Sequence, residues 1–372
     1  MFGPRGLRET FIGPRPPTAS AAQLPANCTR GCESPSSASE RECKRGCSWI
    51  GAQALGLNLL SKSDVAIRAV IVDPSAPQAL RLTEAPEPMA GSSEVLVDVH
   101  HVSLNYGDLN DARSGRVPAG AVLGSDAAGV VARPAADGSG PAVGTRVVAL
   151  AQAAFAERTA VEVDALAEVP RSVDLADAAA LPVAGLAALR ALRAAGPLLG
   201  RRVLITGASG GVGRFAVQLA ARAGAHVIAA VGSVARGEFL ARRGADEVVV
   251  GLEGLDQPVD VVLDNVGGAQ MVEAWQLLAP GGSLQSIGWT SGEPAVFLPY
   301  STVGPPKSLS SFLNEGEAGA DLATLVQLLA DRSLTVEIGW RGPWERIADA
   351  VEMLRGRRLS GKAVLDVGPV TH

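Results

Sequence analysis

The chain has 372 residues, of which 47% are hydrophobic and 19% are charged, and its formal net charge is −5. This length is sufficient for two domains with separate hydrophobic cores, and the weakly acidic balance gives no reason to expect nucleic acid or an acidic membrane surface as a partner. No apolar run approaches the ~20 residues that a membrane-spanning helix needs, so we expect no membrane segment.

Residues 1–62 differ in character from the rest of the chain. Prolines, a polar tract and the lack of a sustained apolar period predict a disordered N-terminal extension. All four cysteines lie in this segment as two Cys-x3-Cys pairs, which could bind a metal or form disulfides in an oxidising compartment. Because the remainder of the chain has no cysteine, we expect no catalytic thiolate or cysteine-bound zinc there, which fits a cytoplasmic enzyme.

From residue 65 the sequence predicts short strands joined by turns. Strands are expected at residues 66–72, 94–102, 124–132 and 144–150, and the alternating valines at 95, 97 and 99 predict a half-buried strand. Many short strands of this kind are typical of a partly open β-barrel. A helical stretch is expected to follow at residues 174–195.

The most informative stretch is residues 203–231. A strand at 203–206, a glycine-rich turn, a helix at 214–223 and a strand at 226–231 form a βαβ unit, and the turn fits G-x-G-x-x-G with Ala208 in the first glycine place. Glycines let the backbone approach a ligand and let the helix pack closely on the strand, while the helix start binds a pyrophosphate. The sequence therefore predicts a dinucleotide site that comprises Thr206, Gly207, Gly210, Gly211, Val212 and Gly213.

The end of the second strand indicates which dinucleotide binds. An NAD site usually places a carboxylate about 20 residues after the glycines. Here the strand is followed by Gly232, Ser233 and Arg236, and the first acidic residue is Glu238. A hydroxyl and a guanidinium suit a 2′-phosphate, so we predict NADPH rather than NADH.

Strands and helices continue to alternate up to residue 288, which predicts a parallel, doubly wound sheet. They are a helix at 235–243, strands at 247–250 and 259–264, a helix at 269–278 and a strand at 283–288. Because ligands bind at the carboxyl ends of such strands, Asn265, Val266, Ile287 and Gly288 join the predicted cofactor site. Helices at 321–330 and 344–354 and strands at 334–338 and 362–366 are expected to complete the chain.

From about residue 65 to its end, the chain resembles the medium-chain dehydrogenase/reductase superfamily, and within it the zinc-independent quinone oxidoreductase branch. The motifs that carry the resemblance lie at residues 102–108 (Val-Ser-Leu-Asn-Tyr-Gly-Asp), 123–131, 143–147, the glycine turn, 264–268, 280–283 and 361–365. The resemblance implies an α/β fold in which a doubly wound parallel Rossmann sheet is inserted in a GroES-like, partly open β-barrel. We therefore divide the chain into an extension (1–62), the first part of a GroES-like catalytic domain (65–182), an NADP-binding domain (183–300) and a return to the catalytic domain (301–372).

The resemblance also implies the activity, which is hydride transfer from NADPH to a quinone or an α,β-unsaturated carbonyl compound, without a metal. Zinc-using relatives have a cysteine where this chain has residues 105–108 and a His-Glu pair where it has Ser125 and Asp126. The small-molecule carbonyl substrate needs a donor on its oxygen, where negative charge develops. Tyr106 is the candidate for that role, or else a buried phenol in the core, and Asn105 is expected to bond the nicotinamide ribose or the substrate. Relatives are commonly dimers, so a homodimer is also implied.

Three departures from the branch leave the substrate open, and so do two other functions. The chain lacks a second tyrosine near Asn110 and has Gly251 and Ala187 where relatives often have tyrosine and threonine. A 2-enoyl-thioester (enoyl-CoA or enoyl-ACP) reductase shares the fold and the chemistry, and a non-catalytic NADPH-binding protein would tolerate the missing tyrosine. A short-chain dehydrogenase is excluded because Tyr300 is followed four residues later by Gly304 instead of lysine.

Overall fold

The computed structural model describes residues 65–314 and 316–368, and all of them belong to one compact unit. The predicted disordered extension and its cysteines lie outside the described residues. None of the helices in these two ranges is long and apolar enough to cross a membrane.

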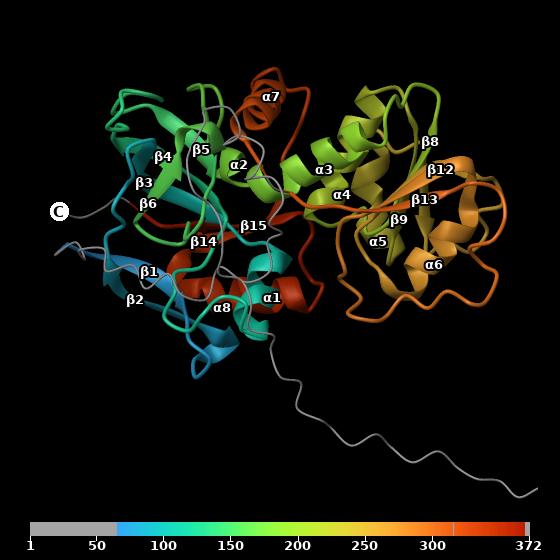
Figure 1. The fold of residues 1–372 in the computed structure, drawn as a ribbon, viewed down its shortest axis with the longest axis horizontal. Helices are drawn as coiled ribbons and strands as arrows, with labels where there is room; N and C mark the ends of the chain where they lie inside the picture. The colour runs from blue at the N-terminus through green and yellow to red at the C-terminus, as the bar shows by residue number, and fades with distance from the viewer. Residues whose placement is uncertain (1–64, 315, 369–372) are drawn as a thin grey trace, which may run out of the picture. The chain divides into compact units, whose positions relative to one another are not determined.

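A mostly antiparallel sheet of seven strands forms the first half of the fold (Figure 1). Its order is β14-β15-β3-β4-β5-β7, with β6 paired to β3, and only the β14–β15 pair is parallel. Its strands are β3 (Glu94–Ser103), β4 (Asp126–Arg133), β5 (Arg146–Leu150), β6 (Arg158–Glu162), β7 (Leu166–Glu168), β14 (Ile338–Pro343) and β15 (Lys362–Asp366). Because β15 pairs with β3, residues 362–366 complete a sheet in which most strands come from residues 94–168.

Smaller elements surround this sheet. They are the hairpin β1 (Ala66–Val72) and β2 (Leu80–Pro86), the helices α1 (Tyr106–Ser114), α2 (Leu175–Ala179) and α8 (Ile347–Arg355), and the 3-10 turns η2 (Pro77–Ala79), η3 (Val163–Ala165) and η4 (Trp344–Arg346). The hairpin, α1 and α8 share one apolar core with the sheet, and fully buried Phe155 and Trp344 are its largest side chains.

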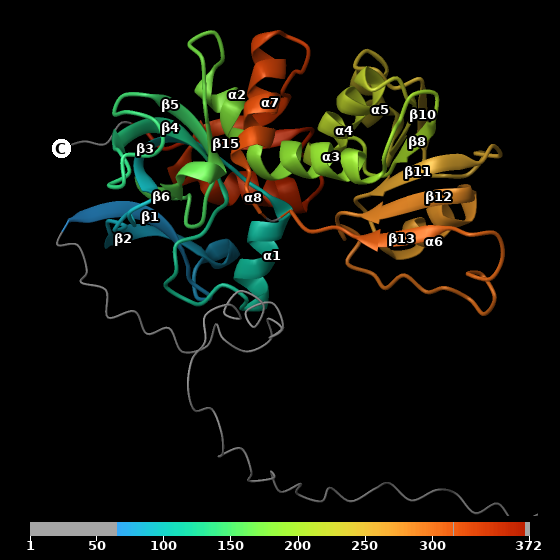
Figure 2. The ribbon, with the colours of Figure 1, turned by 45° about the horizontal axis from the view of Figure 1, so that its top comes forward.

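A parallel sheet of six strands forms the second half, in the order β10-β9-β8-β11-β12-β13. Its strands are β8 (Arg202–Ile205), β9 (His226–Val231), β10 (Glu247–Val250), β11 (Val259–Asp264), β12 (Leu278–Ser286) and β13 (Ser308–Ser311). The helices beside it are α3 (Pro182–Ala194), α4 (Gly211–Arg222), α5 (Val234–Ala241) and α6 (Gly268–Leu277), whereas α7 (Gly319–Ala330) packs on α3 and on β7 of the first sheet. Helices α4 and α5 cover one face and α6 covers the other (Figure 2), with a separate apolar cluster on each face.

The structure confirms the predicted fold class, a doubly wound parallel sheet inserted in a β-rich domain. The parallel sheet includes β13 and so extends past residue 300, where we placed the domain boundary. The predicted domain boundaries themselves stay predictions.

Three local expectations were wrong. The helix expected at 174–195 is two helices: the carboxylate of Asp174 caps α2 by accepting from the amide of Ala176 at 2.8 Å, and Pro182 begins α3, where its fixed φ is favourable. The strand expected at 334–338 begins only at Ile338, because the amide of Leu334 donates to the Leu328 carbonyl at 3.0 Å and that of Thr335 to Oε1 of Gln218 at 2.9 Å instead of to a neighbouring strand. Trp344 begins a 3-10 turn, and the helix proper starts at Ile347.

Candidate active site

The glycine turn connects β8 to α4 through closely packed backbone. Gly207 has φ 59°, which favours glycine, and the amide of Gly210 donates to the Gly207 carbonyl at 2.9 Å. A Cβ atom at Gly213 would lie 2.5 Å from the Cα of Ala208, so only glycine lets α4 pack this closely on the turn. The first amides of α4 have no acceptor within the helix and can bind an anion there. The turn therefore fits the pyrophosphate of a dinucleotide.

Buried polar residues lie beside this turn at the end of β11. Thr206 donates its hydroxyl to Asp264 at 2.6 Å, and the amide of Gly267 donates to the same carboxylate at 2.8 Å. Burial raises the pKa of Asp264. The side-chain amide of Asn265 donates to the Thr206 carbonyl at 2.9 Å, while its Oδ1 is buried and has no hydrogen-bond partner among the described residues. A bound ligand with a donor could satisfy that oxygen.

The predicted 2′-phosphate residues lie together after β9. Ser233 is the residue before α5, Arg236 lies in the first turn of α5, and Gly232 and Ser233 are exposed. A Cβ atom at Gly232 would meet nothing within 4 Å, and within the described part of the chain the guanidinium of Arg236 has no hydrogen-bonding or ionic partner. This corner is open and carries the unpaired guanidinium of Arg236 within the described residues.

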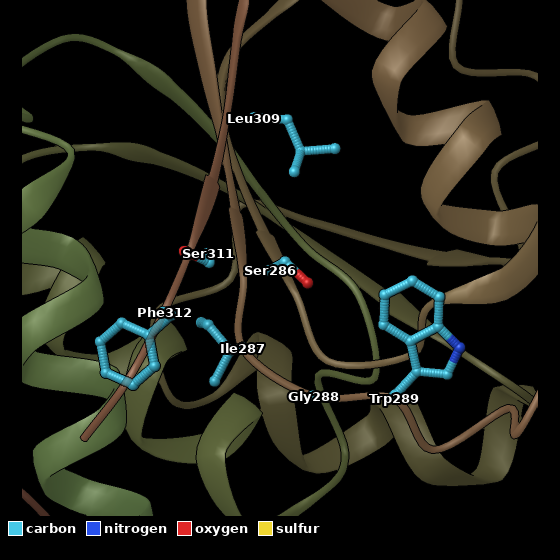
Figure 3. Close-up of a pocket in the computed structure, with 7 residues that line it drawn as sticks. All are labelled: Ser286, Ile287, Gly288, Trp289, Leu309, Ser311 and Phe312. Carbon is cyan, nitrogen blue, oxygen red and sulfur yellow. The ribbon is translucent and has the colours of Figure 1, made fainter. Parts of the chain in front are cut away.

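A pocket of about 360 Å³ opens at the ends of β12 and β13. It is lined by Ser286, Ile287, Gly288, Trp289, Leu309, Ser311 and Phe312, which include two of the predicted cofactor residues. Figure 3 shows Ile287 and Phe312 pointing to one side of the strand pair and Leu309 and Trp289 to the other. The sequence reading missed Trp289, whose ring lies so close to Gly267 that a Cβ atom there would be 2.6 Å from it. Trp289 directly follows Ile287 and Gly288 after β12, so the rule that ligands bind at the carboxyl ends of strands was the available signal, and the prediction stopped one residue short of it.

Asn105 and its neighbours form a buried polar cluster at the start of α1. The Oδ1 of Asn105 accepts a hydrogen bond from Nζ of Lys362 at 2.6 Å, and its Nδ2 donates to Asp108 at 3.3 Å. Ser125 donates its hydroxyl to the other oxygen of Asp108 at 2.6 Å. Burial raises the pKa of Asp108 to about 6, against the opposing effect of the Ser125 hydrogen bond.

Tyr106 is not joined to this cluster by any hydrogen bond in the described structure. It is the first residue of α1 and is partly buried. Arg355 of α8 lies close enough for the two side chains to interact electrostatically, and burial lowers the pKa of that arginine. The catalytic role of Tyr106 therefore stays a prediction.

Two basic side chains join the catalytic half to the nucleotide turn. The stem of Lys362 lies against α4, since a Cβ atom at Gly211 would be 3.0 Å from Cδ of Lys362. Arg214 of α4 is buried, donates to the Ser209 carbonyl at 2.9 Å and pairs with Glu337 just before β14. Asn105 and the glycine turn are thus neighbours in space, although about 100 residues separate them in sequence. In residues 65–314 and 316–368, no three His, Cys, Asp or Glu side chains group as metal ligands.

Comparison with known proteins agrees with this architecture. The alcohol dehydrogenase GroES-like domain matches residues 91–171, and the zinc-binding dehydrogenase family matches residues 238–365. Prostaglandin reductase-3 of Bos taurus is 30% identical over 323 residues, which cover 77% of this chain and 84% of that protein. Acryloyl-coenzyme A reductase of Sulfurisphaera tokodaii is 29% identical over 258 residues, which cover 60% of this chain and 77% of that enzyme. Erythronolide synthase EryA2 of Saccharopolyspora erythraea is 36% identical over 63% of this chain, but the chain spans only 7% of that synthase.

Solved structures match over most of the chain. The quinone oxidoreductase from Coxiella burnetii superposes with a TM-score of 0.73 at 26% identity, over 82% of this chain and all of that one. A mycobacterial protein complexed with NADPH superposes with a TM-score of 0.73 at 27% identity, over 81% of this chain and 99% of that one. The chain therefore belongs to the medium-chain dehydrogenase/reductase superfamily, in the zinc-independent, quinone oxidoreductase-like branch that its motifs predicted.

Proposed function

We propose that this protein is an NADPH-dependent reductase that transfers a hydride to a quinone or to the double bond of an α,β-unsaturated carbonyl compound. The observation that carries the proposal is the contact between the catalytic loop and the nucleotide turn, which Lys362 makes through its ammonium to Asn105 and through its stem to Gly211. A dinucleotide whose pyrophosphate lies on the turn would thus be bound next to Asn105, a side-chain donor for the substrate oxygen.

The cofactor is NADPH, bound along the carboxyl edge of the parallel sheet. The backbone amides at the start of α4 bind its pyrophosphate, and the side chains of Ser233 and Arg236 bind its 2′-phosphate. The nicotinamide end is assigned to Asn265, Val266, Ile287 and Gly288, where a Cβ atom at Gly288 would lie only 3.0 Å from the Asn265 carbonyl. The NADPH complex of the mycobacterial neighbour supports this choice of cofactor.

When bound, NADPH supplies the hydride that reduces the substrate. The protein then has to stabilise negative charge on the substrate oxygen and to exclude water. Asn105 retains one amide hydrogen after its bond to Asp108, and the Tyr106 hydroxyl is free within the described structure, so both are assigned as donors. Trp289 and Phe312 give the pocket apolar walls that suit an uncharged acceptor.

An enoyl-thioester substrate is the second candidate. Acryloyl-coenzyme A reductase and the erythronolide synthase are relatives whose names point to thioester or polyketide chemistry. The third candidate function is NADPH binding without turnover, and the absence of the second tyrosine favours it. We further propose that the protein is cytoplasmic and forms a homodimer.

A measurement of NADPH consumption distinguishes these three candidate functions. The full chain is incubated with NADPH and a panel of quinones, enones and enoyl-CoA esters, beside a control without substrate. Consumption with one class above the control supports the reductase and selects its substrate class. NADPH binding without consumption by any member of the panel would overturn catalysis and leave the binding function.

A further inference from the structure

The ammonium group of Lys362, the first residue of β15, is enclosed by acceptors. It donates to the Leu104 carbonyl at 3.0 Å, to Oδ1 of Asn105 at 2.6 Å and to Oδ2 of Asp126 at 3.2 Å. Lys362 is 4% exposed and Asp126 is fully buried. An ammonium has three donors and no acceptor, so all three of its hydrogens are used here.

Asp126 connects this group to the nucleotide-binding half. Its Oδ1 accepts from the backbone amide of Val183 in α3 at 2.8 Å. Its Oδ2, which also faces Lys362, accepts from the hydroxyl of Ser103 at 2.6 Å. A buried ion pair contributes little to stability compared with well-packed apolar side chains of the same size. The pair instead fixes the orientation of the polar groups that it contacts.

Lys362 and Asp108 together determine which way the Asn105 amide faces. The ammonium requires an acceptor, so Oδ1 must face Lys362, and the carboxylate requires a donor, so Nδ2 must face Asp108. A flipped amide would place its NH2 group against the ammonium and its oxygen against the carboxylate. Both neighbours thus exclude the flipped state, and the amide hydrogen that remains can only donate to a ligand.

We propose that Lys362 is a positioning residue that locks the Asn105 amide as a hydrogen-bond donor, so that the site selects an acceptor such as a carbonyl oxygen. This inference rests on the proposed reductase function for its catalytic meaning. The orientation of the amide does not depend on turnover, so it can be tested separately.

The central variant is Lys362→Met, which keeps an unbranched stem against Gly211 and removes the ammonium. Lys307→Met is the matched control, because in the described part of the chain Nζ of Lys307 donates to the carbonyls of Trp275 and Gln276 near the end of α6 and lies over the Trp275 ring. Because Lys362→Met leaves Asp126 buried without its counter-charge, the double variant Lys362→Met/Asp126→Asn keeps the test valid if the single variant does not fold.

The first measurement uses protein with 15N in its asparagine side chains, with Asn105→Ala to assign the Asn105 signal. In the wild type we expect two distinct amide hydrogens, of which the one bonded to Asp108 exchanges slowly with solvent. In the folded lysine variants the signal should shift and exchange at least about tenfold faster, while Lys307→Met leaves it unchanged. An unchanged Asn105 signal in the folded lysine variants would overturn the proposal, whether or not the enzyme reduces any member of the panel.

The second measurement is a double-mutant cycle on kcat and on the dissociation constant of NADPH. We expect Lys362→Met and Asn105→Ala each to lower kcat about 10- to 100-fold, and the double variant to be no slower than either alone, because both remove the same oriented donor. NADPH affinity should change by less than about threefold. Losses that multiply in the double variant would show that Lys362 acts independently of Asn105, which contradicts the proposal.

Discussion

The nucleotide turn and the polar cluster around Lys362 lie next to each other but are built in opposite ways. The turn presents backbone amides from consecutive residues; its glycines leave these amides open to a ligand, and at Gly213 a side chain would clash with the backbone of Ala208. The cluster presents side chains from three separate segments, namely residues 103–108, 125–126 and 362, and the backbone amide of Val183 donates to it. A site made of backbone is local, whereas a site made of side chains depends on the tertiary fold. The two should therefore respond differently to substitution.

The largest effect is expected from Gly210→Val in the turn. A Cβ atom at Gly210 would lie 3.3 Å from the Gly207 carbonyl, so the fold can adjust, but the branched side chain would occupy the approach of the pyrophosphate. NADPH affinity, measured by fluorescence titration, should fall more than about 100-fold.

Gly91→Val is the matched control, since its Cβ atom would lie 3.3 Å from a flexible Glu94 side chain far from the turn. It should leave NADPH binding unchanged. Tight binding by folded Gly210→Val protein would mean that the turn does not hold the pyrophosphate.

The next effect concerns Tyr106, which stands beside the cluster but outside its hydrogen bonds. If its hydroxyl polarises the substrate, Tyr106→Phe should lower kcat about 100-fold with little change in NADPH affinity. Tyr300→Phe is the control, because Tyr300 is 84% exposed. Equal kcat values for wild type and Tyr106→Phe would leave Asn105 as the donor and refute the role of Tyr106.

Asp108 makes the unfolding free energy depend on pH. Its pKa is raised from 3.8 to about 6, so the folded state holds a proton that the unfolded state releases between these values. The stabilising contribution of the protonated form is present below about pH 4 and is lost as the pH rises through about 6. Relative to Asp108→Asn, the wild type should therefore lose roughly 2 kcal/mol of unfolding free energy across this range, as measured by urea unfolding.

Asp111→Asn, on the same helix, controls for the loss of a carboxylate. If the unfolding free energies of wild type and Asp108→Asn differ by the same amount from pH 4 to pH 7, the pKa of the buried Asp108 carboxyl group is not raised.

The smallest effect is expected at the exposed corner after β9. Arg236→Ala should weaken NADPH binding about tenfold and NADH binding by less than about threefold, because only NADPH carries the 2′-phosphate. Arg242→Ala removes the same charge at the other end of α5 and should affect neither. Equal losses for both cofactors with Arg236→Ala would show that Arg236 does not contact the 2′-phosphate.

The same contrast explains what the sequence could predict. The glycine turn and the first five strands of the parallel sheet follow from local patterns of glycine and apolar residues, and they were found, while the cofactor residues at the strand ends stay predictions. Helix α1 was missed because only Leu109 and Ala112 of its residues are buried, and β13 was missed because Ser-Leu-Ser-Ser has no strand signal. The link from Lys362 to Asn105 was missed because it exists only once β15 pairs with β3, which brings residues 257 positions apart into contact.

The most direct test of the central claim follows deuterium from NADPH labelled at C4 of the nicotinamide, in either configuration. With an enone or an enoyl thioester that is turned over, we predict deuterium from one configuration at the β-carbon of the saturated product, and with a quinone an equimolar yield of hydroquinone. Consumption of NADPH that leaves the acceptor unreduced, deuterium at the carbonyl carbon, or binding of NADPH with no transfer to any acceptor would contradict the account.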